Sequence, residues 1–147
     1  MANLQPRFTV ITLGSADMRR AIAFYTALGF ERRMKQTGDE VAFFATGATV
    51  VALWSWDKLA ADARISQAPQ TSAFRGATLA WNCNSREEVD AVMTHALACG
   101  AELKLAASAT DYGGYRGYFV DPDGHLWEVV TAPGMTVAAD GRLSVPD

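Results

Sequence analysis

The stretch GYFVDPDGHLWEV, residues 117–129, joins two apolar runs through a tight turn and places one carboxylate among apolar side chains. Proline fixes φ and glycine tolerates a positive φ, so DPDG at residues 121–124 predicts a hairpin between strands 115–120 and 125–131. Successive residues of a strand point to opposite faces of a sheet. Glu128 therefore points to the opposite face from its two apolar neighbours.

The rest of the chain predicts two copies of one unit, in which a strand and a helix precede three further strands. Ser15 or Asp17 caps the first helix, and Ser85 with Glu88 forms a capping box for the second. Apolar residues recur three and four positions apart in both helices, and a glycine ends each one. The predicted strands are residues 8–13, 31–36, 41–45 and 48–54 in the first unit, and 77–81, 102–106, 115–120 and 125–131 in the second.

These units predict one α+β domain over residues 1–147, with two β-α-β-β-β modules. Module one spans about residues 8–56 and module two about 76–133, separated by a polar linker at 57–75 that begins with a short helix. The glycines and prolines at 134–147 predict an irregular arm, which is either mobile or covers a partner subunit.

Composition excludes several classes of protein. The 147 residues are 50% hydrophobic, which suits one compact core. Thirteen basic and 16 acidic residues give a net charge of −3 without a basic stripe, so we expect no nucleic-acid partner. No apolar run reaches the length of a membrane helix, so we expect no membrane partner and a cytoplasmic location. Two cysteines in such a chain are more often buried thiols than a disulfide.

The paired modules resemble the vicinal oxygen chelate superfamily, which includes glyoxalase I, bleomycin-resistance and fosfomycin-resistance proteins and extradiol dioxygenases. The resemblance covers residues 8–133 and rests on FYTALGF at 24–30 and GYFVDPDGHLWEV at 117–129. It implies an open, barrel-like sheet with outer helices and a ligand on the concave face. In enzymes of the superfamily, first and last strands of the modules supply ligands to a divalent metal. It also implies a homodimer.

The family's four metal-ligand positions fall on Glu128, Val10, Thr78 and Val51. Valine offers no donor atom and threonine only a weak neutral oxygen, so three of the four positions lack ordinary metal ligands. The two histidines do not compensate: one lies on the second helix, and the other lies three residues before Glu128 and faces the opposite way. We therefore expect no metal cofactor, with a divalent metal bound through Glu128 as the alternative.

Other side chains can line the cavity. The hairpin turn holds four or five residues, and we favour five because that length pairs Tyr118 with Glu128. Arg116 then faces the cavity as well. The loop from Tyr112 to Tyr115 is either a flexible rim or an ordinary glycine-rich turn. The predicted ligand-binding residues are Thr12, Thr78, Asn82, Tyr112, Arg116, Tyr118 and Glu128.

Glu128 has a functional and a structural interpretation. It either contacts a ligand, as a binding group or as a general acid or base, or forms a structural ion pair with Arg116. Our first hypothesis is a small-molecule binding protein of the bleomycin-resistance kind. The alternative is a metal-dependent lyase, isomerase or dioxygenase that uses Glu128 as a catalytic residue, and a purely structural or regulatory module is a third.

Overall fold

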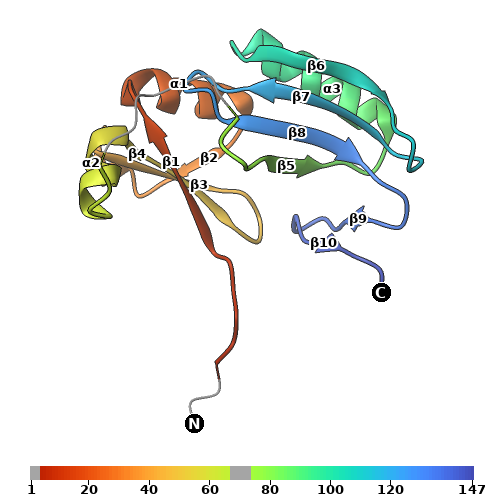
Figure 1. Cartoon of the computed structure of the whole chain (residues 1–147), viewed down its shortest axis with the longest axis horizontal. Coiled ribbons are helices and arrows are strands. Elements are labelled where there is room, and N and C mark those ends of the chain that lie inside the picture. Colours follow the sequence, from red (N-terminus) through yellow and green to blue (C-terminus); the bar gives the residue numbers. More distant parts are fainter. Residues whose placement is uncertain (1–3, 67–73) are drawn as a thin grey trace.

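The computed structural model describes residues 4–66 and 74–147 and contains two open four-stranded sheets (Figure 1). The α+β class and the paired modules are confirmed. The two sheets are not hydrogen-bonded to each other, so they do not close into a barrel. Residues 67–73, inside the expected linker, lie outside the described residues. None of the described helices is long and apolar enough to cross a membrane.

Module one forms the first sheet, in the order β1-β4-β3-β2. Strands β1 and β4 run parallel and the other neighbours run antiparallel. The strand predicted at 31–36 ends early, because Met34 adopts a left-handed conformation and a short 3-10 turn follows. The elements are β1 (Val10–Ser15), α1 (Met18–Leu28), β2 (Glu31–Arg33), η1 (Lys35–Thr37), β3 (Val41–Ala45), β4 (Val50–Ser55) and α2 (Trp56–Asp62).

Module two forms the second sheet with the equivalent order β5-β8-β7-β6. Ser85 caps α3 as predicted, since its hydroxyl accepts a hydrogen bond from the Glu88 amide. The elements are β5 (Leu79–Asn82), α3 (Arg86–Ala98), β6 (Glu102–Ala109), β7 (Tyr115–Val120) and β8 (Leu126–Thr131). The chain then continues into the two-residue strands β9 (Thr136–Val137) and β10 (Leu143–Ser144).

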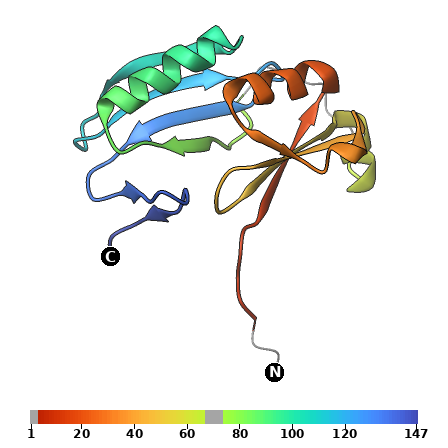
Figure 2. The same ribbon diagram turned by 180° about the vertical axis from the view of Figure 1, so that it is seen from behind.

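The helices α1 and α3 lie next to each other along one side of the molecule (Figures 1 and 2). His95 of α3 lies 3.2 Å from the carbonyl oxygen of Leu28 at the end of α1. Tyr25, Phe44, Phe119 and other buried apolar side chains form one core cluster that includes residues of both modules. Both cysteines are free thiols, as predicted.

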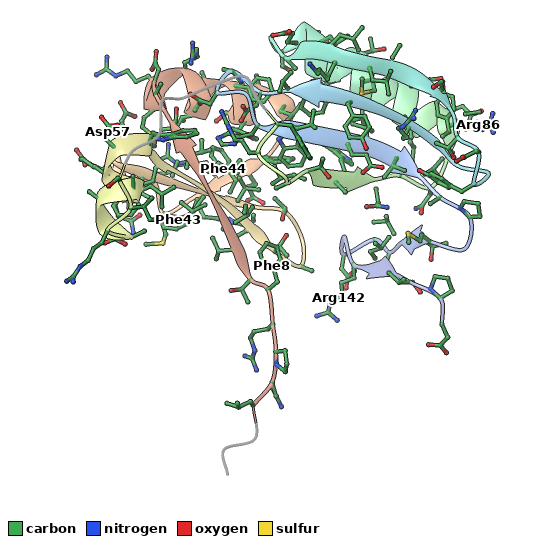
Figure 3. The ribbon with its side chains drawn as sticks, in the orientation of Figure 1. Phe8, Phe43, Phe44, Asp57, Arg86 and Arg142 are labelled. Atoms are coloured by element: carbon green, nitrogen blue, oxygen red, sulfur yellow. The ribbon has the colours of Figure 1, made fainter. Side chains whose placement is uncertain are left out.

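The arm at residues 134–147 is more ordered than predicted. Strands β9 and β10 pair in an antiparallel hairpin, with Val137 opposite Leu143. The local sequence does not alternate clearly between apolar and polar residues, so the hairpin was not recognisable as strands. At the other end of the chain, residues 4–9 extend away from the body, with Phe8 on this extension (Figure 3).

Candidate functional site

The DPDG turn joins the two modules through a buried polar chain. The Tyr25 hydroxyl of α1 donates a 2.6 Å hydrogen bond to Asp121 Oδ2 and accepts one from Trp127 Nε1 at 3.1 Å. The other carboxylate oxygen of Asp121 accepts from two amides of its own turn. Burial, and then the Asp121 charge, raise the pKa of Tyr25 well above its ordinary value. Asp121 is only 5% exposed, so this chain is a structural contact between modules.

Two further side chains of the turn also reach module one. Asp123 Oδ1 accepts a 2.9 Å hydrogen bond from the amide of Ala16, just before α1, where a carboxylate is favoured by the helix dipole. His125 Nε2 lies 2.7 Å from the carbonyl of Gly14, and its Nδ1 lies 2.9 Å from an Arg75 nitrogen. Since arginine only donates, His125 accepts at Nδ1 and donates from Nε2. His125 thus points away from Glu128, as the strand geometry predicted.

Glu128 lies on the face of the second sheet opposite α3. Its neighbours in sequence, Trp127 and Val129, are buried in the core on the α3 side. Tyr118 of β7 is its direct cross-strand partner, which confirms the predicted five-residue connection. We call this side the open face of the second sheet; it carries Ala80, Asn82, Arg116, Tyr118, Leu126, Glu128 and Val130.

Glu128 and Tyr118 interact electrostatically on this open face. The pKa of Tyr118 is raised, first by partial burial and then by the Glu128 charge, with a smaller contribution from a hydrogen bond to Glu128. Tyr112 is close enough to contribute to the same shift, whereas Arg116 opposes it. The predicted residues Tyr112, Arg116, Tyr118 and Glu128 therefore form one polar cluster.

Arg116 does not close over Glu128. Its guanidinium donates to the Ser108 hydroxyl at 3.3 Å and lies 5.9 Å from the centre of the Tyr118 ring. Arg116 and Glu128, both of which the structure describes, form no ion pair with each other. The structural ion pair considered for Glu128 is therefore not formed, and its carboxylate stays half-exposed on an apolar sheet.

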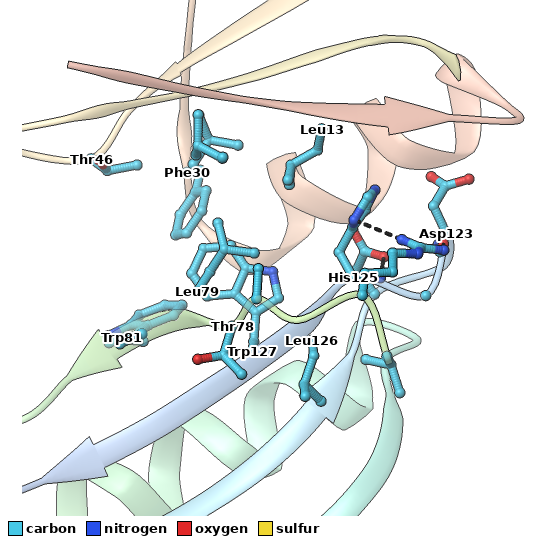
Figure 4. A pocket seen from close by; sticks show the side chains of 18 of the residues that line it. Leu13, Phe30, Thr46, Thr78, Leu79, Trp81, Asp123, His125, Leu126 and Trp127 are labelled. Atoms are coloured by element: carbon cyan, nitrogen blue, oxygen red, sulfur yellow. Dashed lines mark hydrogen bonds between the residues drawn. The ribbon is translucent and has the colours of Figure 1, made fainter. Parts of the chain in front are cut away.

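A groove of about 1060 Å³ runs between the edge strands β1 and β5 (Figure 4). Thr78 and Asn82, both predicted ligand-binding residues, line it. Ala80 also lines the groove, and Glu128 is its partner on the neighbouring strand β8. The polar cluster therefore lies one strand away from the groove wall. The apolar lining includes Leu13, Phe30, Leu79, Trp81, Leu126 and Trp127.

The polar cluster of Tyr112, Arg116, Tyr118 and Glu128 adjoins the groove but does not line it. Thr12 lies apart from both the groove and the cluster. It lies on β1 of the first sheet, paired with Ala52, and does not line the groove. The side chains of β1 that do line it are Ile11 and Leu13, which have the opposite parity. The groove therefore opens beside the core face of the first sheet rather than beside the face that carries Thr12.

The family position assigned to Val51 needs a correction. Val51 is 3% exposed and belongs to the core, so it lies on the helix side of the first sheet. The residue equivalent to Glu128 is Ala52, because Thr12 pairs with Ala52 as Ala80 pairs with Glu128. Two residues separate Gly47 from β4, whereas one residue separates Gly124 from β8, and this difference reverses the parity counted from the turn glycine.

These side chains do not fit the divalent metal that the fold family implies. Besides Glu128, the family's metal-ligand positions hold Val10, Ala52 and Thr78. These three side chains supply one neutral hydroxyl in total, whereas a divalent ion needs several oxygen or nitrogen donors. A module from a second copy would bring the same residues. Across residues 4–66 and 74–147, no three His, Cys, Asp or Glu side chains gather as a set that could hold a metal.

Sequence reasoning missed the residues that depend on how the modules meet. Leu13, Phe30 and Trp81 form the groove because two edge strands face each other, and the alternation within a strand does not reveal this. The roles of Asp121 and Asp123 also depend on the contact between modules, since their partners Tyr25 and Ala16 lie about 100 residues earlier in the chain.

A duplicated β-α-β-β-β domain with a ligand-sized groove between its modules defines the class of this protein. The chain belongs to the Glyoxalase/Bleomycin resistance protein/Dioxygenase superfamily, whose family model matches residues 7–129. A search of the curated proteins finds no match for the chain.

Several solved structures share this fold. A glyoxalase-related enzyme from Fulvimarina pelagi is 31% identical with a TM-score of 0.86, and the match covers 97% of this chain and 100% of that one. Lactoylglutathione lyase from Agrobacterium tumefaciens is 22% identical (TM-score 0.66, covering 87% and 95%). A fosfomycin resistance protein from Listeria monocytogenes is also 22% identical (TM-score 0.68, covering 89% and 97%). The last two similarities concern the fold alone.

Proposed function

We propose that this protein binds a small organic molecule in the groove and on the adjoining open face of the second sheet, without a metal ion. The observation that carries the proposal is the Glu128 carboxylate, which lies half-buried beside Tyr118 and is not neutralised by Arg116. A carboxylate in such surroundings gives strong, charge-assisted hydrogen bonds to a ligand.

The lining supports a ligand with both apolar and polar parts. Binding sites for small molecules are mostly apolar, with a few polar groups that fix the ligand's orientation. Leu79, Trp81 and Leu126 supply the apolar surface. Asn82 supplies an amide at the groove wall, and Glu128 supplies the charge beyond it.

The proposal is tested by elemental analysis of protein purified without a histidine tag, followed by a thermal-shift screen of small organic compounds. We expect no stoichiometric metal and compounds that raise the unfolding midpoint, because they bind only the native state. The Glu128→Gln variant keeps the side-chain shape and should weaken binding of these compounds about tenfold or more.

Glu87→Gln, on the exposed surface of α3, is the matched control and should bind as the wild type does. Stoichiometric Zn, Ni, Mn or Fe whose removal by a chelator abolishes binding would contradict the proposal. That result would favour a metal-dependent lyase, isomerase or dioxygenase instead.

A further inference from the structure

The C-terminal hairpin forms a third wall of the groove between the modules. Val137 of β9 and Leu143 of β10 line the groove, as does Gly141 in the turn between them. The two lining side chains sit directly opposite each other in the hairpin pairing. A segment that follows module two therefore contributes apolar surface to the groove.

Asn84 holds the hairpin at its β9 end. The side-chain amide donates to the carbonyl of Val137 at 2.9 Å, and its oxygen accepts from the Val137 amide at 2.8 Å. The Asn84 side chain thus satisfies the backbone groups of Val137 on the edge of β9 that has no neighbouring strand. Asn84 directly precedes the Ser85 cap of α3, so the attachment point is rigid.

The turn of the hairpin rests against module one. A Cβ atom added at Gly47, in the β3–β4 turn, would lie 2.6 Å from the carbonyl oxygen of Asp140 and 3.1 Å from Gly141 Cα. Thr46 and Thr49 of the same β3–β4 turn also line the groove. The hairpin therefore reaches from module two to module one and bounds the groove at this end.

The hairpin is also the part of the wall best suited to move. It leaves β8 through Pro133 and Gly134, and Gly134 has a φ of 79° that favours glycine. Every residue from 138 to 147 is exposed. Segments with few buried apolar contacts open at low free-energy cost while the core stays folded.

We propose that the C-terminal hairpin is the gate of the groove and that Leu143 and Val137 contact the ligand. The ligand class is a compact molecule with an aromatic or alicyclic body, which packs beneath these side chains and against Trp81. The groove volume of about 1060 Å³ has room for a molecule of this class. This inference rests on the proposed function, because it defines the apolar part of the same ligand.

The first test measures binding of the aromatic probe anilinonaphthalene sulfonate. Binding is monitored by energy transfer from tryptophan to the probe, since Trp81 and Trp127 line the groove. Leu143→Ala should weaken probe binding about three- to tenfold. The control is Val145→Ala in the same arm, whose side chain is 61% exposed and does not line the groove. Equal affinities for the two variants overturn the contact role of Leu143.

The second test measures gating directly by limited trypsin digestion. Arg142 in the hairpin turn has a 77% exposed side chain (Figure 3), and cleavage after it removes residues 143–147. Bound probe should slow this cleavage about threefold or more, and Asn84→Ala should accelerate it about threefold or more. Mass spectrometry follows the loss of the five-residue fragment. Unchanged cleavage rates in both experiments overturn the gate.

The two proposals can fail separately. Glu128→Gln lies outside the hairpin and should leave cleavage after Arg142 at the wild-type rate. If Leu143→Ala weakens probe binding but Glu128→Gln leaves the affinity of the screened compounds unchanged, the hairpin contact is supported and the polar contact with Glu128 is overturned. If Glu128→Gln weakens binding of the compounds but Leu143→Ala leaves probe binding unchanged, the hairpin contact is overturned and the contact with Glu128 is supported.

Discussion

Tyr118 and Glu128 are direct cross-strand neighbours in the antiparallel pair β7–β8, with both side chains on the face opposite α3. Tyr118 is partly buried, and the Glu128 charge raises its pKa further. An aromatic hydroxyl and a carboxylate thus share one environment at the edge of an apolar groove. The pair is the polar centre of the proposed binding site.

Removing the Glu128 charge should lower the pKa of Tyr118. A carboxylate disfavours the nearby phenolate, so Glu128→Gln should lower this pKa while burial keeps it above the ordinary value. Arg116→Gln should shift it the opposite way, because the guanidinium favours the phenolate. Ultraviolet difference titration measures both, with Tyr118→Phe identifying the signal. Identical titrations for wild type and Glu128→Gln would refute the pairing.

Tyr25→Phe should destabilise the fold by about 2–4 kcal/mol, because buried Asp121 and Trp127 both lose their hydrogen-bond partner. Urea unfolding measures the change. Tyr115→Phe is the matched control: it removes an exposed hydrogen bond to Asp90 and should cost less than about 0.5 kcal/mol. Equal losses in the two variants would show that the Tyr25 chain does not join the modules as described.

The same residue predicts how stability depends on pH in alkali. The pKa of Tyr25 is raised in the folded state, so its contribution is fully present below the unfolded value, about pH 10, and is lost as pH rises toward the folded value. The free energy of unfolding should therefore fall above about pH 10. It should fall less steeply in Tyr25→Phe, and thermal midpoints measured across this range compare the two. Parallel curves would count against the raised pKa.

Asp123 should stabilise the contact between its turn and the start of α1. Asp123→Ala leaves the Ala16 amide without this acceptor and should cost about 1–3 kcal/mol. Asp123→Asn keeps an acceptor but removes the charge, and should cost about 0.3–1 kcal/mol. Chemical denaturation of both variants gives the comparison, with exposed Asp140→Ala as control. A larger loss in Asp123→Asn than in Asp123→Ala would contradict this role.

The sequence predicted the modules and the hairpin register well because local rules decide them. Ser85 and the helix-ending glycines set the helix ends, and pairing polar with polar residues placed Tyr118 opposite Glu128. The side assigned to Val51 was wrong because Gly47 lies one residue farther from β4 than Gly124 lies from β8, which reverses the parity counted from the glycine. Alternation fixes which residues share a face, but only once the start of the strand relative to the turn is known.

The groove and its hairpin wall could not be predicted because they depend on contacts between distant segments. The two-residue strands around Val137 and Leu143 are too short to recognise, and Asn84 and Gly47 hold them from both modules. The alignment of β1 with β5 follows from the packing of α1 on module two, where Tyr25 meets Trp127. No local pattern records that packing.

The most direct test of the proposed binding site is a crystal structure of the protein with the strongest compound from the thermal-shift screen. We predict that the compound occupies the groove and that its polar group lies within hydrogen-bond distance of Glu128 and Tyr118. A compound bound away from the second sheet, or a metal ion coordinated by Glu128 between compound and protein, would contradict the account.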